Sequence, residues 1–276
     1  MLYDCKPLFD RIKAELKKEI ETFPAAPRIC VVVTGDDEPS ARYVRNKMRD
    51  FKELGIKGEV IRFDSADDIT DFLLLAAATG GNRFAYDGII VQRPILTPDM
   101  TPKEANAMVT KYMPRSRDID GVVPGSGFMP PSVRGLDLLL REWGYNPAGK
   151  TVVVIGRGDV GRPVAEYLLS RDATVTVCHS KTPPETMIKA MRESDILVGA
   201  AGLKVPIMSL VKSADSVVID YGITKGEDGK LHGDFQSGLA QYYKYHTAVP
   251  GGMGLMVRAG LLLNIIDAYK GRRKMK

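Results

Sequence analysis

The sequence predicts an α/β protein built from two halves, each with a parallel β-sheet covered by helices. Short runs of apolar, β-branched residues alternate with amphipathic stretches through residues 28–94, and the alternation restarts at Thr151. This rhythm is typical of βαβ units and of parallel sheets that are buried on both faces. The segment over residues 97–131 is rich in Pro and Gly, which indicates a domain boundary. A length of 276 residues suits two domains of ordinary size.

The first half is predicted to hold three strands and three helices. The strands are the apolar runs over residues 28–34, 58–63 and 86–94. The helices are stretches with one apolar face, over residues 8–23, 40–55 and 67–80. Pro24, Gly55 and Gly80 stand where these helices are expected to end, because proline and glycine are typical helix terminators.

The second half repeats the alternation after a helix over residues 133–144. Its strands are the apolar runs over residues 151–156, 173–180, 195–202 and 216–222. Its helices are expected over residues 161–171 and 184–193. A glycine-rich stretch at 249–254 then precedes a last helix over residues 255–271.

Composition and charge exclude several classes of protein. Hydrophobic residues make up 44% and charged residues 26% of the chain, which is ordinary for a globular domain and excludes disorder and coiled coil. No apolar run is long enough to cross a membrane, and the first residues do not resemble a signal peptide. The net charge is +5, and the last seven residues hold five of the basic side chains. We therefore expect a solvated basic tail, with neither a nucleic-acid nor a membrane partner.

The cysteines and histidines argue against disulfides and metals. Cys5, Cys30 and Cys178 are odd in number and widely spaced, so neither a disulfide framework nor a CxxC site fits. The chain has three histidines, too few for a histidine-rich metal site. The sequence therefore predicts a metal-free protein of a reducing, cytoplasmic compartment.

A dinucleotide-binding turn is predicted at residues 156–161. Gly156, Gly158 and Gly161 form a GxGxxG pattern between a strand and a helix. In such a pattern the first glycine permits the tight turn, the second lets the backbone approach a pyrophosphate, and the third allows close helix–strand packing. The amides at the start of the helix would bind the phosphates. The alternative is a glycine-rich connection without a ligand.

The residues after the next strand bear on the choice of cofactor. Sites that prefer NAD usually carry Asp or Glu about 20 residues beyond the glycines, whereas this strand is followed by His179, Ser180 and Lys181. A hydroxyl and a cation there, with Arg157 in the turn, suit the 2′-phosphate of NADP. We therefore predict NADP, with NAD as the alternative. His179 is either a cofactor contact or a strand-end residue.

Three polar residues of the helix over residues 40–55 form one face. Ser40, Tyr43 and Lys47 are separated by three and then four positions, so they lie one above the other. A Tyr and a Lys so placed can act as an acid/base or proton-relay pair. The same Tyr-x-x-x-Lys spacing marks short-chain dehydrogenases, but there it follows the dinucleotide turn and here it precedes it. A solvated helix face is the alternative.

Further candidates stand at strand ends and in glycine-rich segments. Gln92 follows the carboxyl end of an apolar strand, where ligands of parallel sheets collect. Asp118 and Asp120 lie in the boundary segment, where substrates often bind; turn chemistry is the alternative, because Asp is common in turns. The stretch from Pro250 to Gly254 either lines a pocket with its amides or is a plain hinge.

In combination, these residues resemble the bifunctional methylenetetrahydrofolate dehydrogenase/methenyltetrahydrofolate cyclohydrolase family of the bacterial FolD type. The matching motifs follow the family order and span nearly the whole chain. They cover residues 35–47, 88–94, 118–121, 149–163, 174–182, 218–223, 229–234 and 249–254.

The resemblance implies a fold of two α/β domains flanking a cleft. Residues 1–123 plus 255–276 would form the folate-binding catalytic domain, and residues 124–254 a Rossmann-like NAD(P)-binding domain. The last helix would return to the first domain, and the protein would be a homodimer. A hydride would pass from 5,10-methylenetetrahydrofolate to NADP, and water would open 5,10-methenyltetrahydrofolate to 10-formyltetrahydrofolate.

The resemblance also implies roles for individual residues. Lys47 would be the main catalytic group of the cyclohydrolase step, Gln92 would hold Lys47 and the attacking water, and Asp120 would bind the polar edge of the pterin. Tyr43 would contact the folate and Ser40 would support the helix face. Further substrate contacts would come from Val91, Arg93, Pro250, Gly251, Gly252, Met253 and Gly254. The cofactor contacts would be Gly156, Arg157, Gly158, Ser180 and Ile223.

The chain departs from the family pattern at several places. The family's Gly-Arg-Ser turn is Gly156-Arg157-Gly158 here and is one residue shorter, which keeps NAD open as cofactor. Arg93 replaces the usual leucine and places a charge beside the folate contacts. Two other readings stay open: a dehydrogenase for another small substrate, and a non-catalytic nucleotide-binding module with an RNA-contacting tail.

Overall fold

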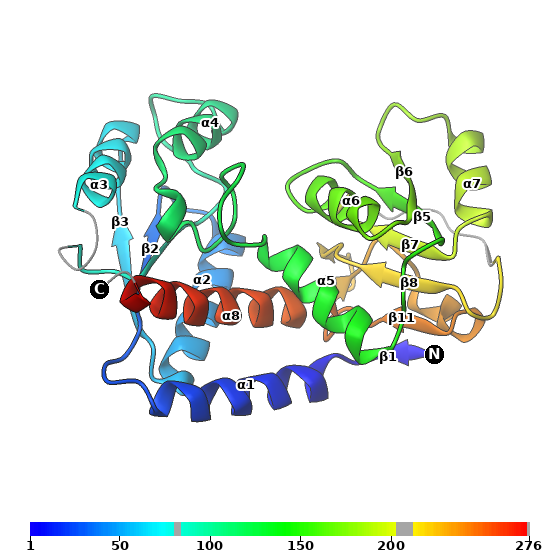
Figure 1. Ribbon diagram of the computed structural model, residues 1–276. Helices are drawn as coiled ribbons and strands as arrows, with labels where there is room; N and C mark the ends of the chain where they lie inside the picture. Colours follow the sequence, from blue (N-terminus) through cyan, green and yellow to red (C-terminus); the bar gives the residue numbers. More distant parts are fainter. Residues whose placement is uncertain (80–83, 203–211, 275–276) are drawn as a thin grey trace. The chain divides into compact units, whose positions relative to one another are not determined.

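The computed structural model describes residues 1–79, 84–202 and 212–274 (Figure 1). The chain forms two compact units. Residues Ile12–Pro131 and Leu261–Lys276 make one, which we call the three-stranded unit. Residues Met1–Arg11 and Ser132–Gly260 make the other, the six-stranded unit. Within the described residues, no helix is long and apolar enough to span a membrane.

The three-stranded unit is built on a parallel sheet in the order β3-β2-β4. Its strands are β2 (Arg28–Val33), β3 (Lys57–Arg62) and β4 (Gly88–Val91). Its helical elements are most of α1 (Lys6–Glu21), α2 (Glu38–Leu54), α3 (Ala66–Ala78), α4 (Pro102–Tyr112) and the 3₁₀ turn η2 (Arg115–Arg117). Cys30, Val32, Ile89 and Val91 pack with α3 and α4 into one apolar cluster. Because alternate residues Ile29, Val31 and Ile90 are also fully buried, both faces of the sheet are covered.

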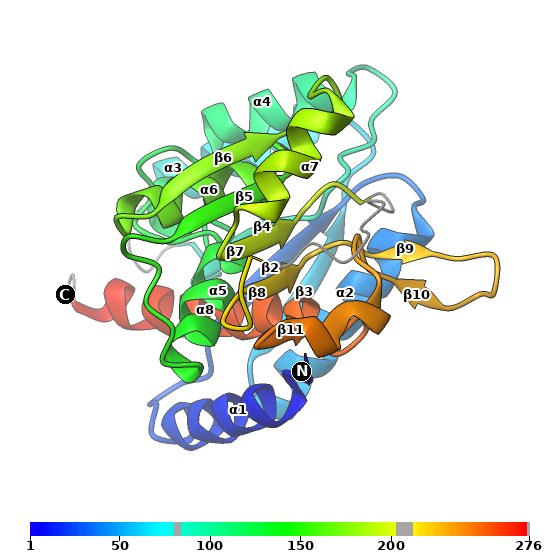
Figure 2. The ribbon, with the colours of Figure 1, turned by 90° about the vertical axis from the view of Figure 1, so that its right-hand side faces the viewer.

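The six-stranded unit holds a parallel sheet in the order β1-β11-β8-β7-β5-β6 (Figure 2). In that order the strands are Leu2–Tyr3, Tyr245–Thr247, Val217–Asp220, Ile196–Gly199, Thr151–Ile155 and Thr174–Cys178. Its helical elements are α5 (Pro131–Glu142), α6 (Gly161–Ser170), α7 (Pro184–Arg192) and the 3₁₀ turn η3 (Ser237–Tyr242). A small antiparallel hairpin, β9 (Thr224–Lys225) with β10 (Leu231–His232), completes the unit.

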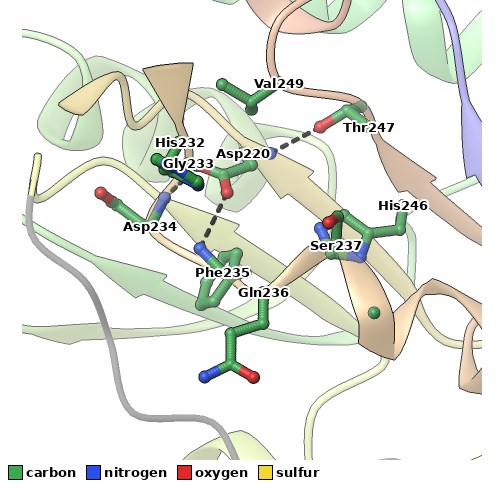
Figure 3. Close-up of a pocket in the computed structure, with 11 residues that line it drawn as sticks. Asp220, His232, Gly233, Asp234, Phe235, Gln236, Ser237, His246, Thr247 and Val249 are labelled. Carbon is green, nitrogen blue, oxygen red and sulfur yellow. Dashed lines mark hydrogen bonds between the residues drawn. The ribbon is translucent and has the colours of Figure 1, made fainter. Parts of the chain in front are cut away.

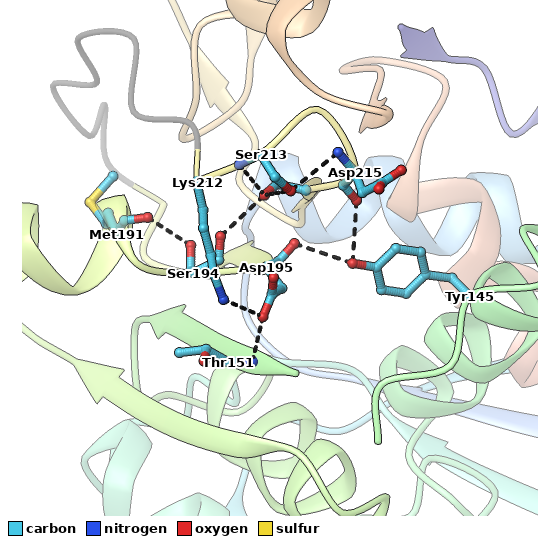
Figure 4. Close-up of polar contacts among 9 residues, drawn as sticks. Tyr145, Thr151, Met191, Ser194, Asp195, Lys212, Ser213 and Asp215 are labelled. Atoms are coloured by element: carbon cyan, nitrogen blue, oxygen red, sulfur yellow. Dashed lines mark hydrogen bonds and ion pairs between the residues drawn. The ribbon is translucent and has the colours of Figure 1, made fainter. Parts of the chain in front are cut away.

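A polar network joins the amino ends of three strands of this sheet (Figure 4). The Asp195 carboxylate accepts hydrogen bonds from the backbone N–H of Thr151 and from Lys212 Nζ, both at 2.9 Å. Ser216 Oγ donates to the carbonyl of Ser194 at 3.3 Å. These bonds satisfy polar groups where β5, β7 and β8 begin. The glycine-rich turn lies at the opposite, carboxyl end of the strands.

The last helix, α8 (Met253–Lys274), contributes residues to both units. From Leu261 onward it belongs to the three-stranded unit, which confirms the expected return of the last helix to the first domain. Asn264 is fully buried there. Its amide donates to the carbonyls of Ile119 at 2.7 Å and Met129 at 2.8 Å, so the helix fixes both ends of the segment between them.

The α/β class, the parallel sheets and the second, Rossmann-like half are confirmed, but the two units do not follow the predicted domain boundaries. The predicted division was 1–123 plus 255–276 against 124–254, whereas residues 1–11 and 255–260 lie in the six-stranded unit and residues 124–131 in the three-stranded unit. The physical reason at the start of the chain is β1, which pairs with β11 through Leu2↔His246 and Tyr3↔Thr247.

Some predicted elements also differ from those observed. The boundary segment over 97–131 contains α4, whose start is fixed by a capping box between Thr101 and Glu104. The predicted end of a helix at Gly80 lies outside the described residues.

Candidate active site

Lys47 and Gln92 meet at the carboxyl end of β4. Lys47 Nζ donates to Gln92 Oε1 at 3.1 Å. Gln92 is the first residue after the strand and is still in register, because its N–H bonds the carbonyl of Val32 at 2.9 Å. Its Nε2 donates to the carbonyl of Arg93 at 2.9 Å. Since the amide nitrogen is engaged there, the amide oxygen must face the lysine.

The helix that carries Lys47 is held against the same strand end. Asp37 caps α2 by accepting from the N–H of Ser40 at 2.8 Å. Ser40 Oγ then donates to the carbonyl of Arg93 at 2.9 Å. The hydroxyl of Ser40 therefore joins the first turn of α2 to the residue after Gln92, and its role toward a substrate stays a prediction. Ser40 and Gln92 both line a cavity of about 490 Å³ in this unit.

Tyr43 is the more open member of the predicted helix face. Its side chain is 45% exposed, and partial burial of the hydroxyl raises its pKa. The phenol therefore stays protonated at neutral pH and offers a hydrogen-bond donor and an aromatic face beside Lys47, one helical turn away.

Asp120 stands on a turn that Asp118 organises. Asp118 is fully buried, and its carboxylate accepts from the N–H groups of Val122 at 3.1 Å and Val123 at 2.8 Å. Burial raises the pKa of Asp118 and the two backbone bonds oppose that rise. Asp120, in contrast, is half-exposed. Of the two predicted carboxylates, Asp118 therefore builds the turn and Asp120 is the one open to a ligand.

The glycine-rich turn of the six-stranded unit shows why its glycines are needed. Gly156 has φ +110°, and a Cβ there would lie 2.3 Å from the carbonyl oxygen of Ala200. A Cβ at Gly161 would lie 2.1 Å from the Gly156 oxygen. At Gly158 a Cβ would meet nothing within 4 Å. The protein itself therefore requires the first and third glycines, and the backbone at the second faces open space.

The groups predicted to contact a cofactor are open to solvent. The N-terminal turn of α6 carries no side-chain cap, so its amides are available to phosphate oxygens. Arg157 and Ser180 are exposed, and Ile223 is 41% exposed. These observations fit a bound dinucleotide, because open amides, a guanidinium and a hydroxyl are the donors that phosphates need.

The loop from Pro250 to Gly254 is partly buried. Gly252 and Met253 are buried, whereas Pro250 and Gly254 are exposed. The carbonyl of Gly251 accepts from the N–H of Cys5 at 2.8 Å. The loop lies in the six-stranded unit, and its contact with substrate stays a prediction.

Asp220 is a buried carboxylate that was not among the predicted site residues (Figure 3). It is 1% exposed and accepts from three backbone N–H groups, those of Gly222 at 2.8 Å, Asp234 at 3.1 Å and Phe235 at 2.9 Å. Burial raises its pKa to about 6 against the effect of these bonds. The carboxylate therefore fixes the backbone that leads from β8 to Ile223.

A cavity of about 540 Å³ adjoins Asp220 and is lined by the residues in Figure 3. His246 forms part of its wall and is 2% exposed. Burial lowers the pKa of His246 to about 4, so the imidazole is neutral at physiological pH. A signal for Asp220 was present in the sequence, since it ends an apolar strand much as Gln92 follows one, but the amides that bind it come from residues further along the chain.

Comparison with known proteins identifies the family of this chain. Residues 3–120 match the model of the tetrahydrofolate dehydrogenase/cyclohydrolase catalytic domain, and residues 130–273 match that of its NAD(P)-binding domain. The chain belongs to the tetrahydrofolate dehydrogenase/cyclohydrolase family. Among its relatives, the bifunctional protein FolD of Hydrogenobaculum is 34% identical over 98% of this chain and 99% of its own.

Solved structures of this family agree along the whole chain. The FolD methylenetetrahydrofolate dehydrogenase/cyclohydrolase of Campylobacter jejuni is 30% identical, covers 99% of both chains and has a TM-score of 0.88. The Trypanosoma brucei enzyme, solved with NADP and an inhibitor, is 28% identical over 98% of this chain and 97% of its own, with a TM-score of 0.83. The present family member is therefore a bifunctional enzyme of one-carbon folate metabolism that uses a nicotinamide cofactor, as the motifs predicted.

Proposed function

We propose that this enzyme oxidises 5,10-methylenetetrahydrofolate with NADP and hydrolyses the product to 10-formyltetrahydrofolate through Lys47. The observation that carries the assignment of residues is the bond from Lys47 Nζ to Gln92 Oε1. The pair stands at the carboxyl end of a parallel strand, where ligands of such sheets bind. The other enzymatic reading, a dehydrogenase for another substrate, loses its support because the chain belongs to the folate family.

Lys47 and Gln92 would act on the water of the cyclohydrolase step. The ammonium group has three donors, of which Gln92 Oε1 engages one. In the hydrolysis, Lys47 would accept a proton from the water whose oxygen bonds the methenyl carbon. As the bond from that carbon to N5 breaks, one proton of the water ends on N5 and the other leaves to solvent, which gives the 10-formyl product. Gln92 would keep the amine from rotating away, since its own amide is locked by Arg93. Asp120 would accept the N–H groups of the pterin edge as a carboxylate.

The six-stranded unit would supply the hydride acceptor's binding site. The cofactor's nicotinamide accepts the hydride when it is bound. The chain's own contribution is positional: Gly158 and the first amides of α6 would hold the pyrophosphate, and Ile223 would lie against the nicotinamide. Asp220 supports the last of these contacts through its bond to Gly222.

The preference for NADP rests on the groups near the end of β6. Arg157 and Ser180 are exposed, and the N–H of Lys181 is turned back onto His179 Nδ1 at 3.2 Å. No carboxylate follows this strand before Glu185, so the usual acceptor for a ribose 2′-hydroxyl is missing from the sequence at that point. A related enzyme was solved with NADP, which supports the same choice.

Substitution of Lys47 tests the catalytic assignment. In Lys47→Met we expect the hydrolysis of methenyltetrahydrofolate to fall at least about a hundredfold, because general acid–base groups contribute about 10²–10⁴. The affinity for NADP should stay within about twofold. Lys52→Met is the matched control, because Lys52 lies on the same helix, is exposed and is not part of the predicted face. Decay of the methenyl absorbance, corrected for spontaneous hydrolysis, measures the rate. Full activity in Lys47→Met would refute the assignment.

The assembly and location of the enzyme are also proposals. We propose a homodimer, as the family resemblance implies; a mass of twice 30.3 kDa in light scattering would support it, and the single-chain mass would refute it. The three cysteines are all buried free thiols, which supports the expected cytoplasmic, reducing compartment.

A further inference from the structure

A second cavity of the three-stranded unit lies away from Lys47 and Gln92. It has a volume of about 330 Å³. Asp87, which precedes β4, is part of its wall, whereas Gln92 follows the other end of that strand. The remaining wall comes from α3, from η2 with the residue before it, from Gly127 and Phe128, and from α8. None of the proposed folate or cofactor contacts lines it.

The wall of this cavity carries more positive than negative charge. The lining residues include three arginines, Arg115, Arg117 and Arg272, and two aspartates, Asp87 and Asp267. Asp87 is also strongly engaged already. Its Oδ1 lies 3.0 Å from Nη1 of Arg272 and 3.5 Å from Nη1 of Arg273. Its Oδ2 accepts a hydrogen bond from the backbone N–H of Arg28 at 2.7 Å. Its charge is therefore shared by two cations.

Arg117 is a buried cation of this wall. It is 4% exposed, donates to the carbonyl of Tyr86, and lies 4.8 Å from the ring centre of Phe84. Burial and the nearby charge of Arg272 lower its pKa, and Asp87 opposes the change to a smaller extent. Arg117 is therefore a buried guanidinium with a second guanidinium, that of Arg272, close enough to affect its pKa.

Arg115 adds a donor at the rim. Its side chain is exposed, and its guanidinium carbon and nitrogens lie within 3.8–4.0 Å of where a Cβ on Gly125 would be. Among the described residues, no hydrogen bond or ion pair engages it. Ser116, beside it on η2, contributes a hydroxyl to the wall. Guanidinium forks together with a hydroxyl are the donors that bind phosphate oxygens well.

We propose that this cavity is a binding site for a phosphate group, distinct from the cofactor site. The guanidiniums of the wall outnumber its carboxylates by one, so the wall favours an anion. The phosphate would contact Arg115 and Ser116 at the rim, with Arg117 and Arg272 behind them. The same chemistry is offered by free phosphate and by a phosphorylated metabolite, and a carboxylate of similar size would match the forks but carry less charge.

Titration with inorganic phosphate tests the site. The protein is first saturated with NADP, so that phosphate cannot occupy the cofactor's own phosphate contacts, and ionic strength is held constant with chloride. Calorimetry should show one phosphate bound per chain. Arg115→Gln should weaken it about tenfold or more, because one charge-assisted contact is removed, and Ser116→Ala should weaken it less. Arg49→Gln is the control, because Arg49 is an exposed arginine of the same unit and should leave binding unchanged.

Three outcomes would overturn the proposal. The first is that the wild type binds no phosphate, and the second is that Arg115→Gln binds phosphate as tightly as the wild type. The third is that sulfate binds as tightly as phosphate and that the affinities for both anions fall equally when salt is added. A parallel titration with glycerol 3-phosphate separates the two sources of the group. Tighter binding than that of inorganic phosphate supports a phosphorylated metabolite in the site, and tighter binding of inorganic phosphate supports the free ion.

Discussion

The buried carboxylate of Asp220 should make the stability of the six-stranded unit depend on pH in a predictable way. Its pKa is raised from the ordinary value of 3.8 to about 6. An acid with a raised pKa binds its proton more tightly in the folded state than in the unfolded state. The stability that this group contributes is therefore fully present below about pH 4 and is lost as pH rises through about 6.

The size of the effect follows from the shift. A difference of about two pKa units corresponds to about 3 kcal/mol between the two protonation states. Over the practical range of pH 4.5 to 7.5, the linkage relation gives a loss of about 2 kcal/mol for a group with these two pKa values. Asp220→Asn removes the titration. The free energy of unfolding of the variant minus that of the wild type should thus rise by about 2 kcal/mol from pH 4.5 to pH 7.5.

The rise of this difference with pH does not depend on the pH-independent cost of the substitution. The amide of the introduced asparagine would place an NH₂ group against backbone donors, which lowers stability by about 1–3 kcal/mol at every pH. The charged or titratable groups near Asp220 are Asp234, His232 and His246, and they remain in both proteins, so most of their contribution cancels.

Urea unfolding followed by tryptophan fluorescence reports on the six-stranded unit, which holds Asp220. The chain has one tryptophan, Trp143, which stacks on Tyr245 with ring centres 4.6 Å apart, and both belong to the six-stranded unit. Asp215→Asn is the control, because it removes an exposed carboxylate of the same unit. A stability difference for Asp220→Asn that stays flat, or falls, over this pH range would refute the reasoning.

Three further predictions concern the cofactor, the sheet edge and α8. Arg157→Ala should raise the KM for NADP more than that for NAD, and equal losses would count against contact with the 2′-phosphate. Burial alone would raise the pKa of Asp195, but its bonds to Lys212 and Thr151 lower it. Asp195→Asn should lower the free energy of unfolding, measured in urea at pH 7, by about 1–2 kcal/mol. This loss should shrink as pH falls through the range in which carboxylates are protonated, and a loss that does not change with pH would contradict the prediction. Asn264→Leu leaves the carbonyls of Ile119 and Met129 without this donor. We expect a higher KM for folate with the affinity for NADP unchanged, and loss of NADP affinity instead would show a general defect.

The strands and the candidate residues Lys47 and Gln92 could be picked out because their signals are local. Runs such as residues 28–33 are apolar throughout most of their length, as central strands of parallel sheets are. The offset of four placed Tyr43 and Lys47 on one helix face, and the strand end made Gln92 a candidate for ligand binding. That Gln92 contacts Lys47 was implied only by the family resemblance. The bond between Lys47 and Gln92 agrees with that implied contact, and the catalytic roles of the two residues stay a prediction.

The features that were missed depend on partners distant in the chain. Two residues, Leu2 and Tyr3, form a strand only because β11 is beside them, and such a short segment carries no periodicity of its own. Asp220 is bound by amides of residues 222–235, and Asn264 by carbonyls more than a hundred positions away. Helix α4 is a different case: its capping box was visible in the sequence, but the prolines and glycines around it suggested a linker.

The three glycines of the dinucleotide turn show how structure separates roles that a motif combines. Gly156 and Gly161 are required by contacts within the protein, since a Cβ at either would come within 2.3 Å of a backbone oxygen. The same requirement would exist in a turn that bound nothing. A Cβ at Gly158 would meet no atom within 4 Å, so folding does not explain its lack of a side chain. The family pattern has serine at this position, so a side chain there is compatible with a bound cofactor. What Gly158 contributes is backbone that no other part of the described protein covers, just before α6, whose first amides carry no side-chain cap.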